Sequence, residues 1–374
     1  MGLQIRDDRQ MKALTGLSQA QCDHLLPVFS DIYRATQQQT YEEGVQSGTR
    51  RRHPGGGSKG KLPTMAEKLE YYQYEVVEHW PRVAIRGAVA DVCVDARGRI
   101  YAGVRNPRED GSVSTILGGV GHVLVLDRDG HEVGSWGNLA SSPHGIWVNP
   151  AGEIYLADTG FHTITKHAPT GELLLALGTK GHPGPDGQPF NMPTHAVEAP
   201  NGDIFVSDGY GQNRIHRFSA RGEHLLTFGG GDPVFIPQRF NLGPMTGRPG
   251  TDPCQFNVPH ELLVTDDHFV YVMDRENHPW QVFTTEDAFV SLQEHVSHPN
   301  RVALDADGTF HIAGGAGIEI WKRDGTKIGS WGEKGEAPGQ FVAGSVHGAW
   351  MDTDGSLYTA EASRNNRLQK FVRV

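Results

Sequence analysis

The sequence predicts an all-β protein, a six-bladed β-propeller, with a short helical appendage at its N-terminus. Three observations carry this prediction. A unit of strand, turn and strand recurs six times after residue 73, and most units continue into a third and fourth strand. Four short strands in each repeat are typical of a propeller blade. The 48 glycines among 374 residues also suit a fold with many tight turns.

The first 66 residues differ from the rest of the chain. Residues 11–38, MKALTGLSQAQCDHLLPVFSDIYRATQQ, repeat apolar side chains at steps of three and four, which predicts a helix. Residues 49–64, TRRRHPGGGSKGKLPT, are basic and rich in glycine, as in a flexible linker. This segment resembles the N-terminal region of insertion-sequence transposases. We therefore expect residues 1–66 to form a helical appendage and linker, and residues 67–374 to form the propeller. The appendage is either a DNA-contacting module or a remnant of a gene fusion.

Each predicted blade begins with a strand, a turn built on Asp, Asn, Pro or Gly, and a second strand. The six units read DVCVDARGRIYAGVR, HGIWVNPAGEIYLAD, HAVEAPNGDIFVSD, HELLVTDDHFVYVMD, NRVALDADGTFHIAG and HGAWMDTDGSLYTAE. The last unit reaches only a third strand, LQKFVRV, before Val374. Residues 73–81, QYEVVEHWP, are expected to supply its outer strand, so that the ring closes without an open edge.

Aligning the units places one residue of each blade at a shared height near the axis. These residues are Asp91, His144, His195, His260, Asn300 and His347. The three histidines of blades two, four and six, His144, His260 and His347, should then converge with threefold geometry. Three imidazole ligands and one open position are what a catalytic zinc uses. His195, in the same alignment, is a further ligand, a proton shuttle or a polar wall residue.

A second set of polar residues follows the second strands. Arg105, Tyr210 and Arg275 are candidates for catalysis, because a tyrosine can move a proton and an arginine can hold a carboxylate with two hydrogen bonds. Asp158 and Asp208 stand in a repeated turn and are interpreted as structural.

Composition excludes several classes. The net charge of −10 is unlike that of a nucleic-acid-binding protein, so we expect no nucleic acid on the propeller. No apolar run is long enough to span a membrane, and no secretory signal is visible. Three cysteines without CxxC spacing give no disulfide framework, which favours a cytoplasmic protein.

Residues 73–374 resemble the NHL-repeat propeller of peptidyl-α-hydroxyglycine α-amidating lyase and its bacterial relatives. The resemblance lies in SSPHGIWV, IFVSDGYGQNRIHRFS, FNVPHELLV, YVMDRENHPWQVF and VHGAWM. It implies a zinc ion held by His144, His260 and His347, a catalytic Tyr210, and arginines Arg105 and Arg275 in the site. Where the family has an aspartate that helps to hold a structural calcium, this chain has Gly348, which puts the calcium in doubt.

Three functions follow as hypotheses. The first is a lyase that cleaves the C–N bond of an α-hydroxyglycine-type carbinolamide, derived from a small molecule or a peptide. The second uses the same three histidines in a hydrolase of an ester, lactone or amide. The third is an interaction scaffold without catalysis. The metal is expected to be zinc, but imidazole ligands also suit other divalent transition metals.

Overall fold

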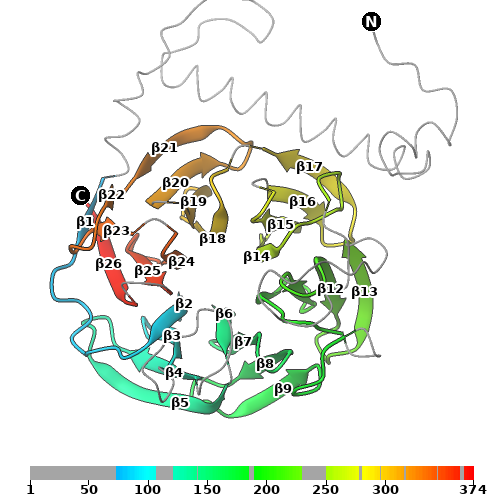
Figure 1. The fold of residues 1–374 in the computed structure, drawn as a ribbon, viewed down its shortest axis with the longest axis horizontal. Helices are drawn as coiled ribbons and strands as arrows, with labels where there is room; N and C mark the ends of the chain where they lie inside the picture. Colours follow the sequence, from blue (N-terminus) through cyan, green and yellow to red (C-terminus); the bar gives the residue numbers. More distant parts are fainter. Residues whose placement is uncertain are drawn as a thin grey trace, which may run out of the picture. The chain divides into compact units, whose positions relative to one another are not determined.

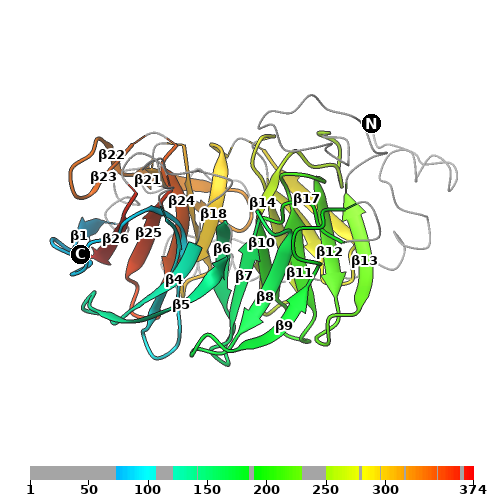
Figure 2. The same ribbon diagram turned by 60° about the horizontal axis from the view of Figure 1, so that its bottom comes forward.

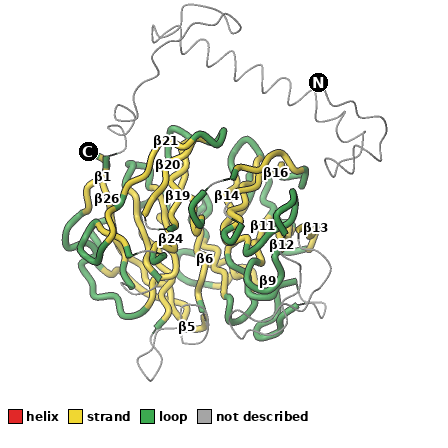
Figure 3. Tube along the Cα trace, turned by 45° about the horizontal axis from the view of Figure 1, so that its top comes forward, coloured by secondary structure: helices red, strands yellow, loops and turns green. Residues whose placement is uncertain are grey.

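In the computed structural model, the described residues are 73–106, 121–140, 142–184, 189–229, 250–277, 280–294, 296–315, 317–342, 344–362 and 366–374. The chain divides into two units, Met1–Ala66 and Glu67–Val374, and every described residue belongs to the second. The predicted helix and linker lie outside the described residues, so they stay predictions. No helix occurs in the part that the structure describes (Figure 3), and hence none that is long and apolar enough to cross a membrane.

The described residues form six four-stranded antiparallel sheets around an axis, as the repeats predict (Figure 1). Blade one consists of β2 (Ala88–Val94), β3 (Ile100–Arg105), β4 (Gly121–Leu126) and β5 (Glu132–Ala140). Blade two has β6 (Pro143–Val148), β7 (Ile154–Asp158), β8 (Thr163–His167) and β9 (Leu173–Leu177). Blade three has β10 (His195–Glu198), β11 (Ile204–Asp208), β12 (Arg214–Phe218) and β13 (His224–Gly229).

The second half of the ring repeats this order, and Figure 2 shows the propeller from another direction. Blade four has β14 (Pro259–Val264), β15 (Phe269–Asp274), β16 (Trp280–Thr284) and β17 (Phe289–Gln293). Blade five has β18 (Pro299–Leu304), β19 (Thr309–Gly314), β20 (Gly317–Lys322) and β21 (Lys327–Trp331). Blade six has β24 (Val346–Met351), β25 (Leu357–Glu361), β26 (Leu368–Arg373) and β1 (Tyr74–Val76). A small parallel pair, β22 (Glu333–Lys334) and β23 (Gln340–Phe341), lies between blades five and six in the sequence and was not predicted.

The ring closes as expected, because β1 pairs with β26 and gives the last blade its outer strand. The paired segment is shorter than residues 73–81: Tyr74 faces Arg373 and Val76 faces Phe371. Beyond it, Trp80 is buried against blades one and six, and its indole Nε1 donates to the carbonyl of Arg128 at 3.2 Å. β1 therefore joins the two ends of the propeller, and the Trp80 side chain packs between the first and the last blade.

The hydrophobic core lies between the blades rather than at the axis. Six clusters of buried residues each join two neighbouring sheets, and the last of these pairs blade five with blade six. Each buried aliphatic or aromatic side chain stabilises the fold by roughly 1.5–3 kcal/mol. Because the apolar side chains pack in these interfaces between blades, the innermost strands can present polar side chains to the axis.

In five of the six blades, a β-bulge near the start of the innermost strand sets which side chains face the axis. The register of the first hairpin shifts between Val89 and Asp91 in blade one, and between Pro143 and Ile146 in blade two. The same shift follows Pro259, Pro299 and Val346 in blades four, five and six. A bulge re-aims a side chain without ending the strand.

Candidate metal centre and active site

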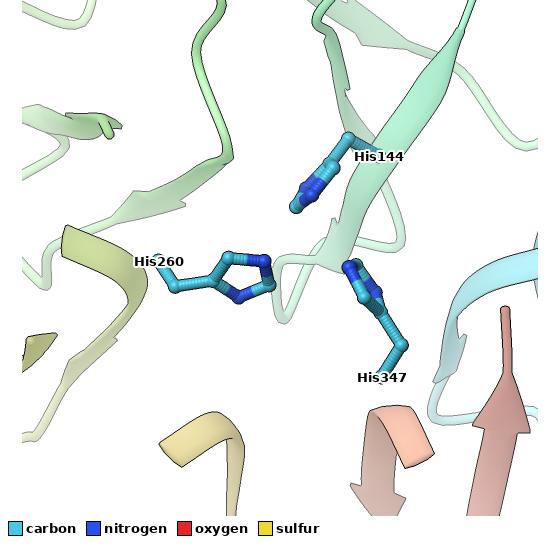
Figure 4. A group of neighbouring side chains, drawn as sticks. All are labelled: His144, His260 and His347. Atoms are coloured by element: carbon cyan, nitrogen blue, oxygen red, sulfur yellow. The ribbon is translucent and has the colours of Figure 1, made fainter. Parts of the chain in front are cut away.

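Three histidines meet at the axis (Figure 4). They are the bulge residues of blades two, four and six, His144, His260 and His347. Their ring centroids are 4.6, 4.7 and 4.8 Å apart, close to an equilateral triangle. In Figure 4 the three rings point toward a common centre. The chain thus brings together imidazoles that are more than 80 residues apart in the sequence.

A backbone carbonyl fixes the orientation of each ring. The Nδ1 atoms of His144 and His260 lie 2.7 Å from the carbonyl oxygens of Thr194 and Asn300, and Nδ1 of His347 lies 2.6 Å from that of Ala90. A carbonyl only accepts, so Nδ1 must carry the hydrogen and Nε2 keeps its lone pair. This is the tautomer in which a metal-binding histidine donates to an outer partner.

Burial keeps these imidazoles neutral. It lowers the pKa of His347 to about 3, and those of His144 and His260 to well below the ordinary 6.5. The guanidinium of Arg275 lowers the pKa of all three, and that of Arg105 lowers the pKa of His144 and His347. A neutral imidazole is the form that binds a metal.

The donor set therefore fits a transition metal. Three neutral Nε2 atoms face one centre from fixed rings, and the potential ligand atoms of the three residues lie within 4.8 Å of one another. Nitrogen ligands of this kind suit zinc, copper, iron or nickel. One other group with suitable side chains occurs among the described residues: Asp127, Asp129 and His131 on the turn after β4. Of these two groups, the three histidines are the one in contact with a candidate catalytic residue, Tyr210.

Tyr210 lies beside this triangle. Its hydroxyl is 3.0 Å from His144 Nε2 and 3.2 Å from His260 Nε2, and the residue is 6% exposed. Arg275 Nη1 donates to the same hydroxyl at 3.2 Å, and its guanidinium lies 5.3 Å from the ring centroid of Tyr210. A phenolic oxygen thus stands at the nitrogens that would bind the metal, with a cation in contact with it.

The two arginines differ in how they are held. Arg275 is anchored by Glu276, whose Oε1 accepts from Nη2 at 3.0 Å. Arg105 is 3% exposed, and its Nε donates to the carbonyl of Pro143, next to His144, at 2.8 Å. Burial lowers the pKa of Arg105 to about 10, so it remains cationic at neutral pH. The two positive charges and Tyr210 share one buried region with the histidines.

His195 does not lie at the triangle of the three histidines. The predicted alignment, which makes His195 equivalent to His144 and His260, is wrong by one residue. In blade three, His195 pairs with Ser207, just as Glu261 pairs with Met273 in blade four. The residue equivalent to His260 is therefore Thr194. By the same register, the equivalent in blade one is Ala90 and not Asp91. The cue lay in the sequence: His195 precedes Asp208 by 13 residues, whereas His144 and His260 precede their aspartates by 14.

The aspartates of the repeated turns have the structural role expected of them. Asp158 Oδ1 accepts from the backbone N–H groups of Ser142, Gly160 and Phe161, each at 3.0 Å. Asp208 Oδ2 accepts from the Asn191 N–H at 2.8 Å and from Gln212 Nε2 at 2.7 Å. Asp208 thus holds the loop that carries Tyr210, and Asp158 holds the start of the strand that carries His144.

The residues do not fit the calcium implied by the resemblance. A Cβ atom added to Gly348 would lie 2.4 Å from Asp91 Oδ1, so no aspartate side chain has room there. The carboxylates nearby, Asp91 and Glu261, are already paired with the guanidinium of Arg301. Site reasoning from the sequence missed Arg301 and Glu261 entirely.

No family model matches the chain. A probable peptidyl-alpha-hydroxyglycine alpha-amidating lyase of Caenorhabditis elegans is 29% identical over 204 residues, covering 51% of this chain and 54% of that protein. The peptidylglycine alpha-amidating monooxygenase of Rattus norvegicus is 36% identical over 162 residues, 41% of this chain and 15% of that protein. NHL repeat-containing protein 3 of Homo sapiens is 27% identical over 224 residues, 56% of each chain. The matched region is thus about half, or much less, of the length of these relatives.

Solved structures agree on the propeller fold. A streptogramin B lyase aligns with a TM-score of 0.51 at 14% identity, over 81% of this chain and 98% of that one. A gluconolactonase of Xanthomonas campestris aligns with a TM-score of 0.54 at 14% identity, over 77% and 87% of the two chains. At such identity the likeness concerns the fold alone.

Proposed function

We propose that this protein is a metal-dependent lyase that cleaves the C–N bond of an α-hydroxyglycine-type carbinolamide. The observation that carries the proposal is the position of Tyr210, whose hydroxyl is within 3.2 Å of two metal-facing histidine nitrogens and of Arg275. A proton-transfer group in contact with both a metal site and a cation is what this elimination requires. The named lyases among the relatives support the same chemistry.

A metal ion bound by His144, His260 and His347 would polarise the substrate oxygen and favour its deprotonation. The residues of the chain do the rest. Arg275 Nη1 donates a hydrogen bond to the phenolic oxygen of Tyr210, and that oxygen takes the proton of the substrate hydroxyl. The hydroxyl oxygen then forms a carbonyl, and the C–N bond breaks with its electron pair going to nitrogen. Nitrogen receives the proton that Tyr210 took from the hydroxyl, and the products are glyoxylate or a related aldehyde and a free amide.

The carboxylate of such a substrate needs a fixed cation. Arg105 and Arg275 supply two, held by Pro143 and Glu276 respectively. A guanidinium can bind a carboxylate through two parallel hydrogen bonds, which orients it as well as attracting it. Orientation of the carboxylate would aim the neighbouring hydroxyl at Tyr210. We propose a small or peptide-derived carboxylate as the substrate and no nucleic acid or membrane as a partner.

The test is an assay of purified protein with an α-hydroxyglycine compound such as α-hydroxyhippurate, with glyoxylate as the product measured. We expect turnover that is lost with a chelator and restored by zinc. A matched assay with simple esters and lactones runs beside it. Hydrolysis of those compounds with no glyoxylate would replace the lyase by a metal hydrolase. No turnover of either, with no bound metal, would favour a scaffold.

A further inference from the structure

One residue beyond the three histidines, the innermost strands carry a second set of polar side chains. By the hairpin register these positions are Asp91, His195, Glu261 and Arg301 in blades one, three, four and five. None is more than 4% exposed. We call these four residues the axial cluster.

The other two blades have glycine at this position, Gly145 and Gly348. A Cβ at Gly145 would lie 2.5 Å from His195 Cδ2, and one at Gly348 would lie 2.4 Å from Asp91 Oδ1. Added methyl groups would therefore collide with the axial cluster itself. The two glycines leave space for the side chains of the other four blades.

Arg301 is the centre of the axial cluster. Its Nη1 lies 2.6 Å from Glu261 Oε1 and 3.1 Å from Asp91 Oδ2, and it contacts His195 Nε2. Its Nη2 donates to the carbonyl of Ile146 at 3.1 Å, and its Nε to that of Ala349 at 3.3 Å. These partners belong to blades four, one, three, two and six. One guanidinium on blade five thus contacts all five other blades.

The axial cluster is joined to the metal-binding histidines through the backbone. The carbonyls that receive the Nδ1 hydrogens of His347, His144 and His260 belong to Ala90, Thr194 and Asn300. The residues that follow these three in the chain are Asp91, His195 and Arg301. Every carbonyl that orients a metal ligand is therefore one peptide bond from a side chain held by, or belonging to, Arg301.

We propose that Arg301 is a positioning residue that fixes the three carbonyls, and through them the three histidine rings, in the geometry that binds the metal. Its guanidinium carries a permanent positive charge and contacts the five other blades at the axis. The inference rests on the metal site of the proposed function, but not on the reaction.

The first test compares Arg301→Met with Arg301→Lys and with Arg217→Met. Arg217 also joins two blades, since it pairs with Asp203 and Asp287, but it lies on the third strand of its blade, away from the axis. Affinity for Co²⁺ and Zn²⁺ is measured by competition with a chelator, the Co²⁺ absorption spectrum reports ligand geometry, and thermal melting reports the fold. Loss of an outer partner typically weakens a metal site 10- to 100-fold. We expect a loss of this size, with an altered spectrum, in Arg301→Met and a smaller one in Arg301→Lys. Arg217→Met should keep the affinity within about twofold.

Removing one partner of a buried ion pair is costly, so Arg301→Met alone can fail to fold. The triple variant Arg301→Met, Asp91→Asn, Glu261→Gln removes the carboxylates' charge together with the cation. It should melt close to the wild type and still bind metal at least about tenfold more weakly. Wild-type affinity in a folded triple variant would overturn the inference.

The two proposals fail in different ways. A wild-type protein that binds zinc but yields no glyoxylate refutes the lyase and leaves the positioning test intact. A wild-type protein that binds neither Co²⁺ nor Zn²⁺ refutes both. Weak binding in the Arg301 variants beside normal binding in Arg217→Met supports the positioning role whichever reaction the site performs.

Discussion

The side chains at the bulge position and those one residue further along the same strands differ in symmetry. At the bulge, histidines of alternate blades form a nearly equilateral triangle, and the other three blades contribute only carbonyls to it. One residue further, the blades contribute a cation, two carboxylates, an imidazole and two glycines. The same six innermost strands therefore carry a symmetric set of neutral imidazoles and, one residue further along, an asymmetric set of mostly charged side chains.

The difference fits what we propose that each set binds. Three imidazoles at similar distances from one centre, which threefold alternation of one residue type supplies, suit a transition metal. A buried guanidinium instead needs its donors matched to carboxylates and carbonyls in several directions. A propeller can satisfy both needs because repeated strands bring six equivalent positions to the axis, and each blade can vary its residue there independently.

The most severe way to break the symmetric set is to remove one ligand. In His260→Ala we expect metal binding to be lost and lyase turnover to fall by at least about 10³-fold, because the ion supplies several kcal/mol of stabilisation. Metal content of the purified variant and glyoxylate production measure this. The circular dichroism spectrum should not change, since the hydrophobic clusters lie between the blades. A variant that keeps its metal would show that His260 is not a ligand.

A smaller effect is expected from the hydroxyl that contacts the ligands without being part of the triangle. Tyr210→Phe should bind metal normally and lose about 10²-fold in kcat, the usual contribution of a proton-transfer group. The comparison of kcat with KM separates this from substrate binding. An unchanged kcat would assign the proton transfer to another group. Loss of the metal in this variant would instead mean that the phenolic oxygen is itself needed to hold it.

The surroundings of the triangle, in which His144 and His260 are buried and His347 is half-buried, predict an unusual pH dependence. Three ordinary histidines of pKa near 6.5 would together lose about 10³-fold in metal affinity at pH 5.5. The pKa of His347 is lowered to about 3 and those of His144 and His260 to well below 6.5, so their Nε2 atoms stay unprotonated there. We expect less than about tenfold loss of affinity between pH 7.5 and 5.5, measured by competition with a chelator.

The same shifts have a consequence for the metal-free protein. Below pH 6.5 the unfolded chain binds more protons at these histidines than the folded one does. Their contribution to the free energy of unfolding is therefore full above pH 6.5 and falls as the pH is lowered. In the metal-affinity measurement, a steep drop between pH 7 and 6 would mean that the three histidines titrate like ordinary imidazoles, which contradicts the lowered pKa values.

Much of this arrangement could be predicted from the sequence, because repeats carry geometry with them. Six units imply six blades, and one residue type at one place in alternate units implies a triangle. The incomplete last unit implied that β1 closes the ring, as it does. What the pattern does not contain is the bulge. The first hairpin shifts its register at His144 in blade two but not within β10 of blade three, where His195 pairs with Ser207 and Thr194 takes the position equivalent to His144; only a spacing of 13 instead of 14 hints at this.

The role of Arg301 could not be predicted from the sequence, for another reason. Its partners are scattered from Asp91 to Ala349, and each looks like an ordinary residue of a repeated strand. The long side chain acts across the axis, so its contacts follow from three-dimensional closure rather than from any local motif. The carbonyls of Ala90, Thr194 and Asn300 are likewise invisible to residue-type reasoning, because every residue has one.

The smallest expected effect tests whether the odd-numbered blades, at the bulge position itself, act through their backbone alone. Asn300 stands at the bulge of blade five; its carbonyl accepts from His260, while its side-chain Nδ2 donates to the carbonyl of Val346 at 2.8 Å. Asn300→Ala keeps the first hydrogen bond and deletes the second. We expect a loss of about 1–3 kcal/mol in the free energy of unfolding, from the buried carbonyl of Val346 left without its donor. Metal affinity should stay within about twofold of the wild type. Chemical denaturation and the chelator competition measure the two quantities on the same sample. A tenfold or larger loss of affinity here would mean that the bulge side chains of the odd-numbered blades also shape the site, and the contrast between side-chain ligands and backbone support at the bulge position would fail.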